Sequence, residues 1–271
     1  MLTSFFAEKK MLTLALVAIS SWLLVMAVYV FQIGGLAGVA WVGDLYSILV
    51  ASAVTTLSFM VWQNSTPGEL ARRVWVLFTL GFALWTLGEA IWGFYELLLG
   101  EEIPYPSLAD VAWLSAYIPL AIALFIRYRS LKVSPESSEW RRIILFYLLV
   151  FAILFVVLLL PILSYPEYDS PVEQALDALY PLSELLLLYF VLLLVVALRG
   201  GHLAFPWMIL AVGFMISVMA ESMFSYGTWN EIYFPEGGIN SFTIAADAIY
   251  FLSYLVLGMG IFGELQLSKS N

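Results

Sequence analysis

Long apolar runs separated by short polar breaks dominate this chain of 271 residues. Eight runs are about 20 residues long, the length that an α-helix needs to cross the hydrocarbon core of a bilayer. The predicted spans are residues 11–31, 44–63, 73–98, 108–128, 142–162, 174–198, 205–228 and 245–265. Turn-forming segments such as Asn64-Ser65-Thr66-Pro67-Gly68 lie between them. The pattern therefore predicts an all-α integral membrane protein with eight transmembrane helices.

The basic residues predict how these helices are oriented. With eight spans, every lysine and arginine falls on one side, before an odd-numbered span or after an even-numbered one. They are Lys9, Lys10, Arg72, Arg73, Arg127, Arg129, Lys132, Arg141, Arg142, Arg199 and Lys269. Loops that carry an excess of Lys and Arg stay in the cytoplasm. We therefore expect a multi-pass protein of the cell membrane, surrounded by the lipid bilayer, with both termini in the cytoplasm.

The loops on the opposite side are acidic. They carry Glu101, Glu102, Glu167, Asp169, Glu173, Glu231 and Glu236. One interpretation is that acidic residues are tolerated on the translocated side, where they contribute little to topology. The other is an outer vestibule whose negative potential concentrates cations.

Composition excludes several classes of chemistry. Hydrophobic residues make up 63% of the chain and charged residues 11%, far from the balance of a soluble domain. The chain has no cysteine and a single histidine, His202, so disulfides, thiolate metal sites and bis-histidine haem are excluded. The phosphate-binding loop, zinc-protease and serine-hydrolase motifs are absent. The net charge of −9 is unfavourable for a nucleic-acid partner, and without these motifs we expect no cofactor and no enzymatic activity.

The chain also has the pattern of four tandem helical hairpins, with approximate bounds 1–68, 69–135, 136–200 and 201–271. In three of them an aromatic residue follows an aspartate by three positions. The third and seventh spans instead share a glutamate, Glu89 and Glu221. Since each hairpin has two spans, all copies have the same orientation, and the predicted symmetry axis runs along the membrane normal. The aspartates that open the even-numbered spans are Asp44, Asp110, Asp177 and Asp247.

Three glutamates fall inside predicted spans: Glu89, Glu221 and Glu184. An ionisable group inside a bilayer is costly and usually faces a cavity or a partner. These residues are therefore candidates for a cation or proton site, or for a polar anchor of a ligand. The alternative is a glutamate that is hydrogen-bonded to a neighbouring helix and contributes to packing.

The four aspartates and the nearby aromatic residues each have two interpretations. Acidic residues in the first turn favour the helix dipole and can cap the helix. Alternatively, four carboxylates form a ring at the outer mouth that attracts cations or holds a hard metal ion, whose identity the sequence leaves unknown. Trp92, Trp113 and Tyr117 belong either to an interfacial aromatic belt or to a ligand-binding site.

The segment from Gly88 to Tyr117 carries a resemblance to a known class of proteins. Its residues Gly88-Glu89-Ala-Ile-Trp92 and Pro106-Ser107-Leu-Ala-Asp110-Val-Ala-Trp113-Leu-Ser-Ala-Tyr117 resemble the multi-pass membrane regions at the front of prokaryotic signalling proteins. In those proteins, similar hairpins precede histidine-kinase or diguanylate-cyclase modules. The resemblance implies a sensory role, with Glu89, Asp110, Trp113 and Tyr117 as the matching positions. The sequence ends about six residues after its last predicted span, so we expect no output module and a signal that passes to a partner protein.

These observations leave three functions open. We expect a membrane-embedded sensory or ligand-binding protein without enzymatic activity, which acts through a signalling partner. The first alternative is a proton or sodium channel or transporter that uses the carboxylates inside the membrane. The second is a structural subunit of a membrane complex. The sequence does not fix the oligomeric state.

Overall fold

The computed structural model describes residues 2–99, 104–133, 135–166, 168, 170–198, 205–235 and 238–269. Every regular element in these ranges is a helix. They are α1 (Leu2–Phe31), α2 (Gly35–Asn64), α3 (Leu70–Gly93) with the π-helical η1 (Phe94–Leu99), α4 (Leu108–Ser130), α5 (Ser137–Leu154) with the π-helical η2 (Phe155–Leu159), α6 (Leu160–Ser164), α7 (Pro171–Ala197), α8 (Phe205–Trp229) and α9 (Ser241–Ser268).

The prediction of eight apolar helices is confirmed. Eight helical segments in the described ranges are long and apolar enough to cross a membrane, with α5, η2 and α6 forming one of them. The largest differences are at the starts of the first two spans, where α1 begins at Leu2 instead of residue 11 and α2 at Gly35 instead of residue 44. The segment between Gly35 and Asp44 contains several glycines, which are typical of turns, so the sequence pattern placed the start of the second helix after them.

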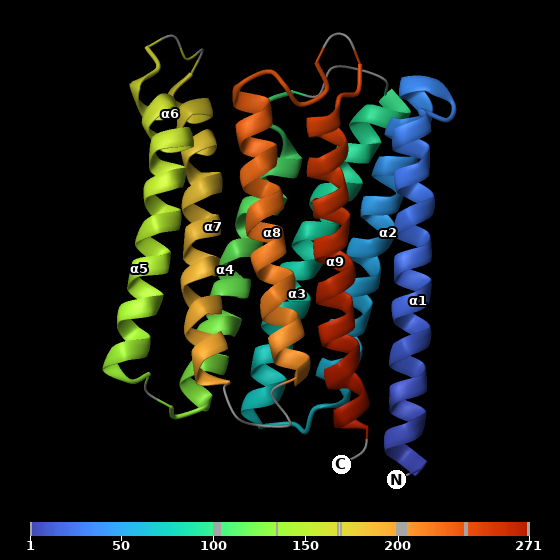
Figure 1. The fold of residues 1–271 in the computed structure, drawn as a ribbon, viewed down its shortest axis with the longest axis vertical. Helices are drawn as coiled ribbons and strands as arrows, with labels where there is room; N and C mark the ends of the chain where they lie inside the picture. Colours follow the sequence, from blue (N-terminus) through green and yellow to red (C-terminus); the bar gives the residue numbers. More distant parts are fainter. Residues whose placement is uncertain are drawn as a thin grey trace.

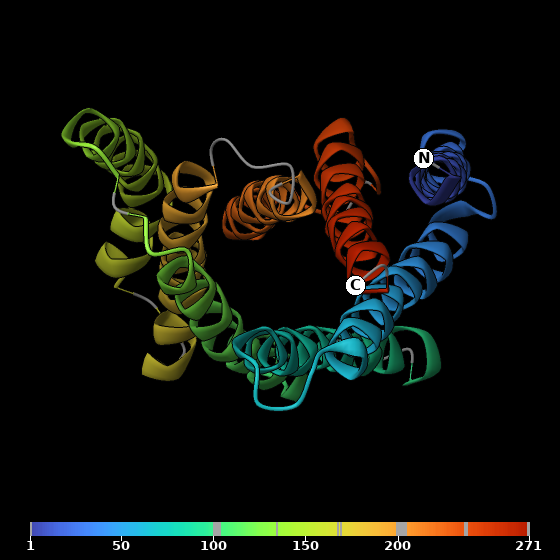
Figure 2. The ribbon, with the colours of Figure 1, turned by 90° about the horizontal axis from the view of Figure 1, so that it is seen from below.

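Six of the helices form a closed ring. Consecutive neighbours around it are α2, α3, α4, α7, α8 and α9, and α9 packs on α2 to complete the circuit. Figure 2 shows this ring along its axis, with α1 outside the seam of α2 and α9, and with α5 and α6 outside α7. Both chain ends lie at the same end of the bundle (Figure 1).

Each half of the chain contributes three ring helices and one outer helix. The order α2, α3, α4 continues as α7, α8, α9 around the ring, which is the arrangement that a two-fold axis along the bundle produces. The sequences of α3 and α8 show the same two-fold relation. In four pairs of matching residues, the two members are 132 positions apart. They are Trp75 and Trp207, Gly81 and Gly213, Phe82 and Phe214, and Glu89 and Glu221.

A cluster of aromatic side chains fills the interior of the helix ring near the end that holds the termini. We call it the aromatic plug; it consists of Trp75, Phe78 and Phe82 from α3 and Trp207 and Phe214 from α8, each at most 3% exposed. The two helices meet across the bundle through these rings, with centroids 5.5 Å apart for Trp75 and Trp207 and 6.1 Å apart for Phe82 and Phe214. Aromatic pairs at such separations stabilise a core beyond their buried area.

Glycines allow neighbouring helices of the ring to approach closely. A Cβ atom added at Gly260 of α9 would lie 2.7 Å from the Leu210 amide nitrogen and 2.9 Å from the Pro206 carbonyl oxygen of α8. These are backbone atoms, which cannot move aside as a side chain can. Small residues serve the same purpose in helix interfaces of membrane proteins generally.

We predict that Gly260→Ala destabilises the protein by about 1–3 kcal/mol, because the added methyl group overpacks the interface of α8 and α9. Gly258→Ala is the matched control on the same helix, since its Cβ would make only an ordinary contact, 3.6 Å from Val54. Thermal unfolding in detergent should show a lower midpoint for Gly260→Ala and little change for Gly258→Ala. Equal midpoints for the two variants would contradict this account of the packing.

Candidate functional site

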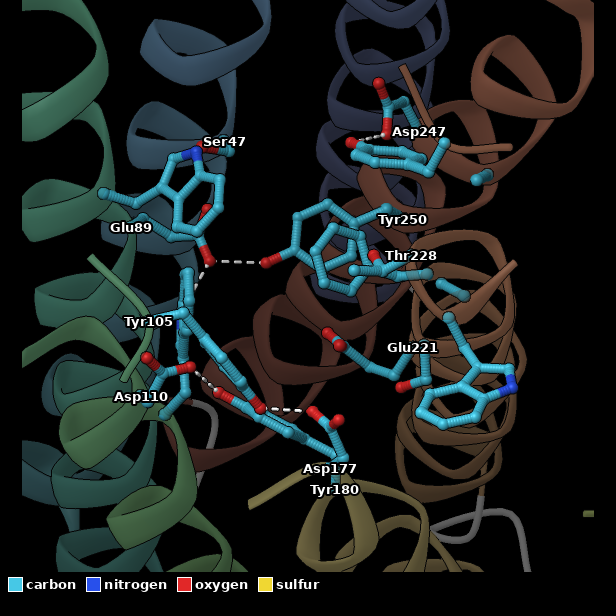
Figure 3. Close-up of a pocket in the computed structure, with 18 of the residues that line it drawn as sticks. Ser47, Glu89, Tyr105, Asp110, Asp177, Tyr180, Glu221, Thr228, Asp247 and Tyr250 are labelled. Carbon is cyan, nitrogen blue, oxygen red and sulfur yellow. Dashed lines mark hydrogen bonds between the residues drawn. The ribbon is translucent and has the colours of Figure 1, made fainter. Parts of the chain in front are cut away.

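A cavity of about 800 Å³ occupies the ring at the end opposite the termini. We call it the chamber. Each of the six ring helices contributes a carboxyl residue to its wall, and Figure 3 shows five of these as labelled side chains. In chain order the six residues are Asp44, Glu89, Asp110, Asp177, Glu221 and Asp247.

The wall of the chamber is acidic and aromatic. Glu173 of α7 and Glu231 of the loop between α8 and α9 also line it, and none of the described lining residues is basic. Tyrosine and tryptophan rings supply much of the remaining surface. Acidic groups that line one cavity without basic counterions create a negative potential that favours a cation in the chamber. Of the acidic loop residues that the sequence highlighted, Glu101, Glu102, Glu167, Asp169 and Glu236 lie outside the described residues, as do Arg199 and His202.

Glu89 is a buried acceptor that connects three helices. It is 6% exposed on α3, and its Oε1 atom accepts hydrogen bonds from Trp113 Nε1 of α4 at 3.0 Å and from Tyr250 Oη of α9 at 2.5 Å. Both donors follow an aspartate by three positions, on the helix face that carries that aspartate. The repeated pattern in the sequence therefore places two equivalent aromatic donors on one carboxylate.

Capping explains only one of the four aspartates. Asp110 lies in the first turn of α4, and its Oδ2 accepts hydrogen bonds from the Ser107 amide at 2.7 Å and from Ser107 Oγ at 2.8 Å, which completes a capping box. Its Oδ1 accepts a further bond from Tyr180 Oη at 2.6 Å. This aspartate is therefore a helix cap and part of the chamber wall at once.

The capping interpretation is wrong for Asp44, Asp177 and Asp247. Their helices begin several residues earlier, at Gly35, Pro171 and Ser241, and the last two have Ser170 and Asn240 as their caps. The reason is that each helix extends further toward its N-terminus than the predicted span, through small and apolar residues before Asp44 and through partly polar segments before Asp177 and Asp247. The three side chains consequently lie on inner helix faces, where they line the chamber.

Tyrosines from the connecting segments donate hydrogen bonds to two of these aspartates. Asp177 accepts hydrogen bonds from Tyr105 Oη and from Tyr168 Oη, the latter at 2.8 Å, and Asp247 accepts one from Tyr233 Oη at 2.8 Å. Burial raises the pKa of all three phenols above its usual range, and the neighbouring aspartate raises it further. These tyrosines therefore keep their protons at neutral pH and remain hydrogen-bond donors.

Two carboxyl groups of the chamber have no such donor. Asp44 Oδ2 is buried without a hydrogen-bond partner in the described part of the chain. Glu221 lines the chamber, its carboxyl group points into the open space (Figure 3), and no hydrogen bond to it is formed by the described residues. These two groups can still accept hydrogen bonds or a positive charge from a molecule in the chamber.

Glu184 has a different environment. It is 1% exposed on α7, it does not line the chamber, and its Oε1 atom accepts a hydrogen bond from Tyr117 Oη of α4. This arrangement matches the interpretation of a glutamate hydrogen-bonded between helices. Tyr117 itself lines the chamber and packs edge-on against Trp85, with ring centroids 5.9 Å apart.

The structure brings nine of the ten candidate residues of the sequence analysis to one chamber, with Glu184 as the exception. Trp92 lines it while donating to Glu96 at 3.0 Å. Sequence analysis selected Tyr117 but none of the other tyrosine donors. Tyr180 and Tyr250 carry a detectable signal, because they occupy the repeat position of Trp113. Tyr105, Tyr168 and Tyr233 lie in loops, where no periodic pattern identifies them.

We predict that Tyr117→Phe destabilises the protein by about 1–3 kcal/mol, because Glu184 is then buried without a donor. Tyr254→Phe is the control. Tyr254 packs on the same Trp85 ring at 6.2 Å, but its hydroxyl meets only the Tyr250 hydroxyl, at 3.2 Å. Thermal unfolding in detergent should separate the two variants, and equal midpoints would show that the bond to Glu184 contributes little.

Comparison with protein-family models, with characterised proteins and with solved structures finds no significant match to this chain. The function therefore has to be argued from the chamber itself.

Proposed function

We propose that this chain is a sensory or ligand-binding protein of the cell membrane, and that the chamber holds its ligand. Both termini lie in the cytoplasm, so the chamber opens toward the outer face. The placement of the basic residues supports this orientation. Every described lysine and arginine lies at the end of the bundle that holds the termini, as the elements that carry them show, and cytoplasmic loops are rich in these residues.

The outer surface of the bundle supports a location within lipid. Large apolar side chains are exposed on the outer helices, among them Leu145, Leu148, Leu149, Ile153 and Val156 of the fifth span. Soluble monomers rarely expose contiguous apolar surface of this extent. Hydrocarbon chains cover such a surface without cost, so the exposed residues become the lipid contact.

The observation that carries the proposal is that the chamber ends on the aromatic plug. Trp85 lines the chamber and packs on Phe82 of the plug at 5.9 Å. At the far side of the plug the Arg127 guanidinium lies 4.3 Å from the Trp207 ring. A blind, partly polar cavity of this volume is typical of a small-molecule site. The occupied state would be read by a partner protein, and the proposed role includes no enzymatic step.

Cation transport is the second candidate, and the acidic chamber favours it. Eight acidic residues line the chamber, as expected for the entrance of a cation pathway. A conducting path would also have to pass the aromatic plug. Its packed rings oppose the passage of a hydrated cation, which is why we place ligand binding first.

We predict no H⁺, Na⁺ or K⁺ flux into proteoliposomes containing the wild-type protein beyond that of empty liposomes, because the plug interrupts the path. The comparison is the double variant Glu89→Gln/Glu221→Gln, with correct insertion checked for both proteins. Flux in the wild type that disappears in the double variant would establish transport and overturn the binding-protein proposal.

The orientation has its own test, which the absence of cysteine in the natural chain makes simple. We predict that a membrane-impermeant maleimide labels Asn230→Cys on intact cells, because Asn230 is exposed at the chamber end of α8. Thr66→Cys, exposed in the turn after α2 at the other end, should react only after the membrane is permeabilised. The reverse pattern would place the termini outside.

A further inference from the structure

We infer that the chamber's ligand is an organic ammonium ion and that Glu221 is the carboxylate that pairs with its charge. This inference rests on the proposed ligand-binding function and adds the chemical class of the ligand. It follows from a difference between the two halves of the chain: Glu89 and Glu221 are related by the internal two-fold axis, but they differ in their hydrogen bonds.

Glu89 and Glu221 occupy equivalent positions on α3 and α8. They are 132 positions apart in the sequence, and the plug residues Phe82 and Phe214 have the same separation. Trp113 and Tyr250 are also equivalent, because each follows the aspartate of its own hairpin by three positions. A symmetric arrangement would give each glutamate one aromatic donor. Instead both donors bind Glu89 Oε1, and Glu221 accepts no hydrogen bond from the described residues.

Glu221 has no basic partner in the chamber. It shares the chamber wall with other carboxyl residues, and the described wall offers no lysine, arginine or histidine. A carboxylate in a low-dielectric site without a donor or a counterion is costly. Asp44 Oδ2, buried without a partner on the same wall, is a second acceptor with the same need. A bound cation removes this cost, whereas an anion would increase it.

The walls around Glu221 match an ammonium group carried on an organic molecule. Trp85, Phe224, Trp229, Tyr250 and Tyr254 all line the chamber, and aromatic faces attract ammonium groups through cation–π interactions. The hydroxyl of Tyr250 is already used for Glu89, so that residue offers mainly its ring. The chamber volume of about 800 Å³ lies in the range of pockets for drug-sized molecules.

The spacing of the carboxyl groups favours an extended organic cation over a bare metal ion. They come from all six ring helices and from the loop between α8 and α9, and within the described residues no group of three comes close enough to hold a metal ion. Hard cations such as Ca²⁺ need six to eight oxygen ligands at once. An ammonium ion needs only one carboxylate and an aromatic environment.

The test uses the full-length protein in detergent and follows tryptophan fluorescence, because Trp85, Trp92, Trp113 and Trp229 line the chamber. Phenethylammonium is the cationic probe, and phenethyl alcohol is its neutral isostere. We expect saturable binding of phenethylammonium, with the alcohol weaker by about 10-fold or more, as the loss of a charged hydrogen bond predicts. Ser225→Trp, which fills part of the chamber, should abolish the response, whereas Met219→Trp, on the outward face of α8, should retain it.

Variants of the glutamates assign the charge. Glu221→Gln should weaken phenethylammonium binding by about 10-fold or more and leave binding of the alcohol unchanged. Glu221→Asp keeps the charge and should preserve the preference for the cation. Glu89→Gln should have a smaller effect, because its carboxylate is already occupied by two donors. Glu69→Gln, exposed at the other end of the bundle, is the control for the change in net charge.

Several results would overturn the inference. If the alcohol binds as tightly as the cation and Ser225→Trp blocks both, the chamber binds ligands but does not select an ammonium ion. If Glu221→Gln leaves cation binding intact in a folded protein, another carboxylate pairs with the charge. The absence of any saturable response to phenethylammonium would also contradict it. None of these results depends on the flux measurement, which tests the binding function separately.

Discussion

The arrangement of this protein depends on hydrogen bonds from aromatic side chains to buried carboxyl groups. The described chamber wall has no basic residue, so tyrosine and tryptophan provide the donors that carboxylates need inside an apolar bundle. Several of these bonds join different helices of the ring: Trp113 and Tyr250 reach Glu89, Tyr180 reaches Asp110, and Tyr117 reaches Glu184. The same bonds that satisfy the acidic groups therefore hold the ring together around the chamber.

Along its axis the bundle has two parts, a packed apolar core and a polar cavity. The part near the termini is a conventional core, in which glycines admit close helix contacts and aromatic rings from α3 and α8 fill the interior. The part near the opposite end encloses a polar chamber. Since the same six helices build both parts, the packed part fixes the helix positions, and the chamber can retain carboxyl groups such as that of Glu221, which accepts no hydrogen bond from the described residues.

Sequence analysis predicted the features that depend on local pattern. The eight apolar helices follow from hydropathy, and the acidic residues of the chamber were visible as ionisable groups within or beside apolar runs. The closed ring was not predictable, because it depends on contacts between distant segments, such as the bond between Glu89 and Tyr250, 161 positions apart. The positions of Asp177 and Asp247 inside their helices were also missed, because polar first turns hide a helix start from any hydropathy pattern. The bounds of the four hairpins remain a prediction.

Because the two halves belong to one chain, residues at equivalent positions of the internal two-fold relation can differ. The two halves surround the chamber as the two subunits of a symmetric dimer surround a cavity on their shared axis. Identical subunits must present identical side chains there, so every change made on one side is made on both. Joining the halves in one chain removes that restriction. Glu89 and Glu221 accordingly differ in their surroundings: both line the chamber, but only Glu89 accepts hydrogen bonds from described residues of neighbouring helices. Two identical subunits related by an exact two-fold axis could not show this difference.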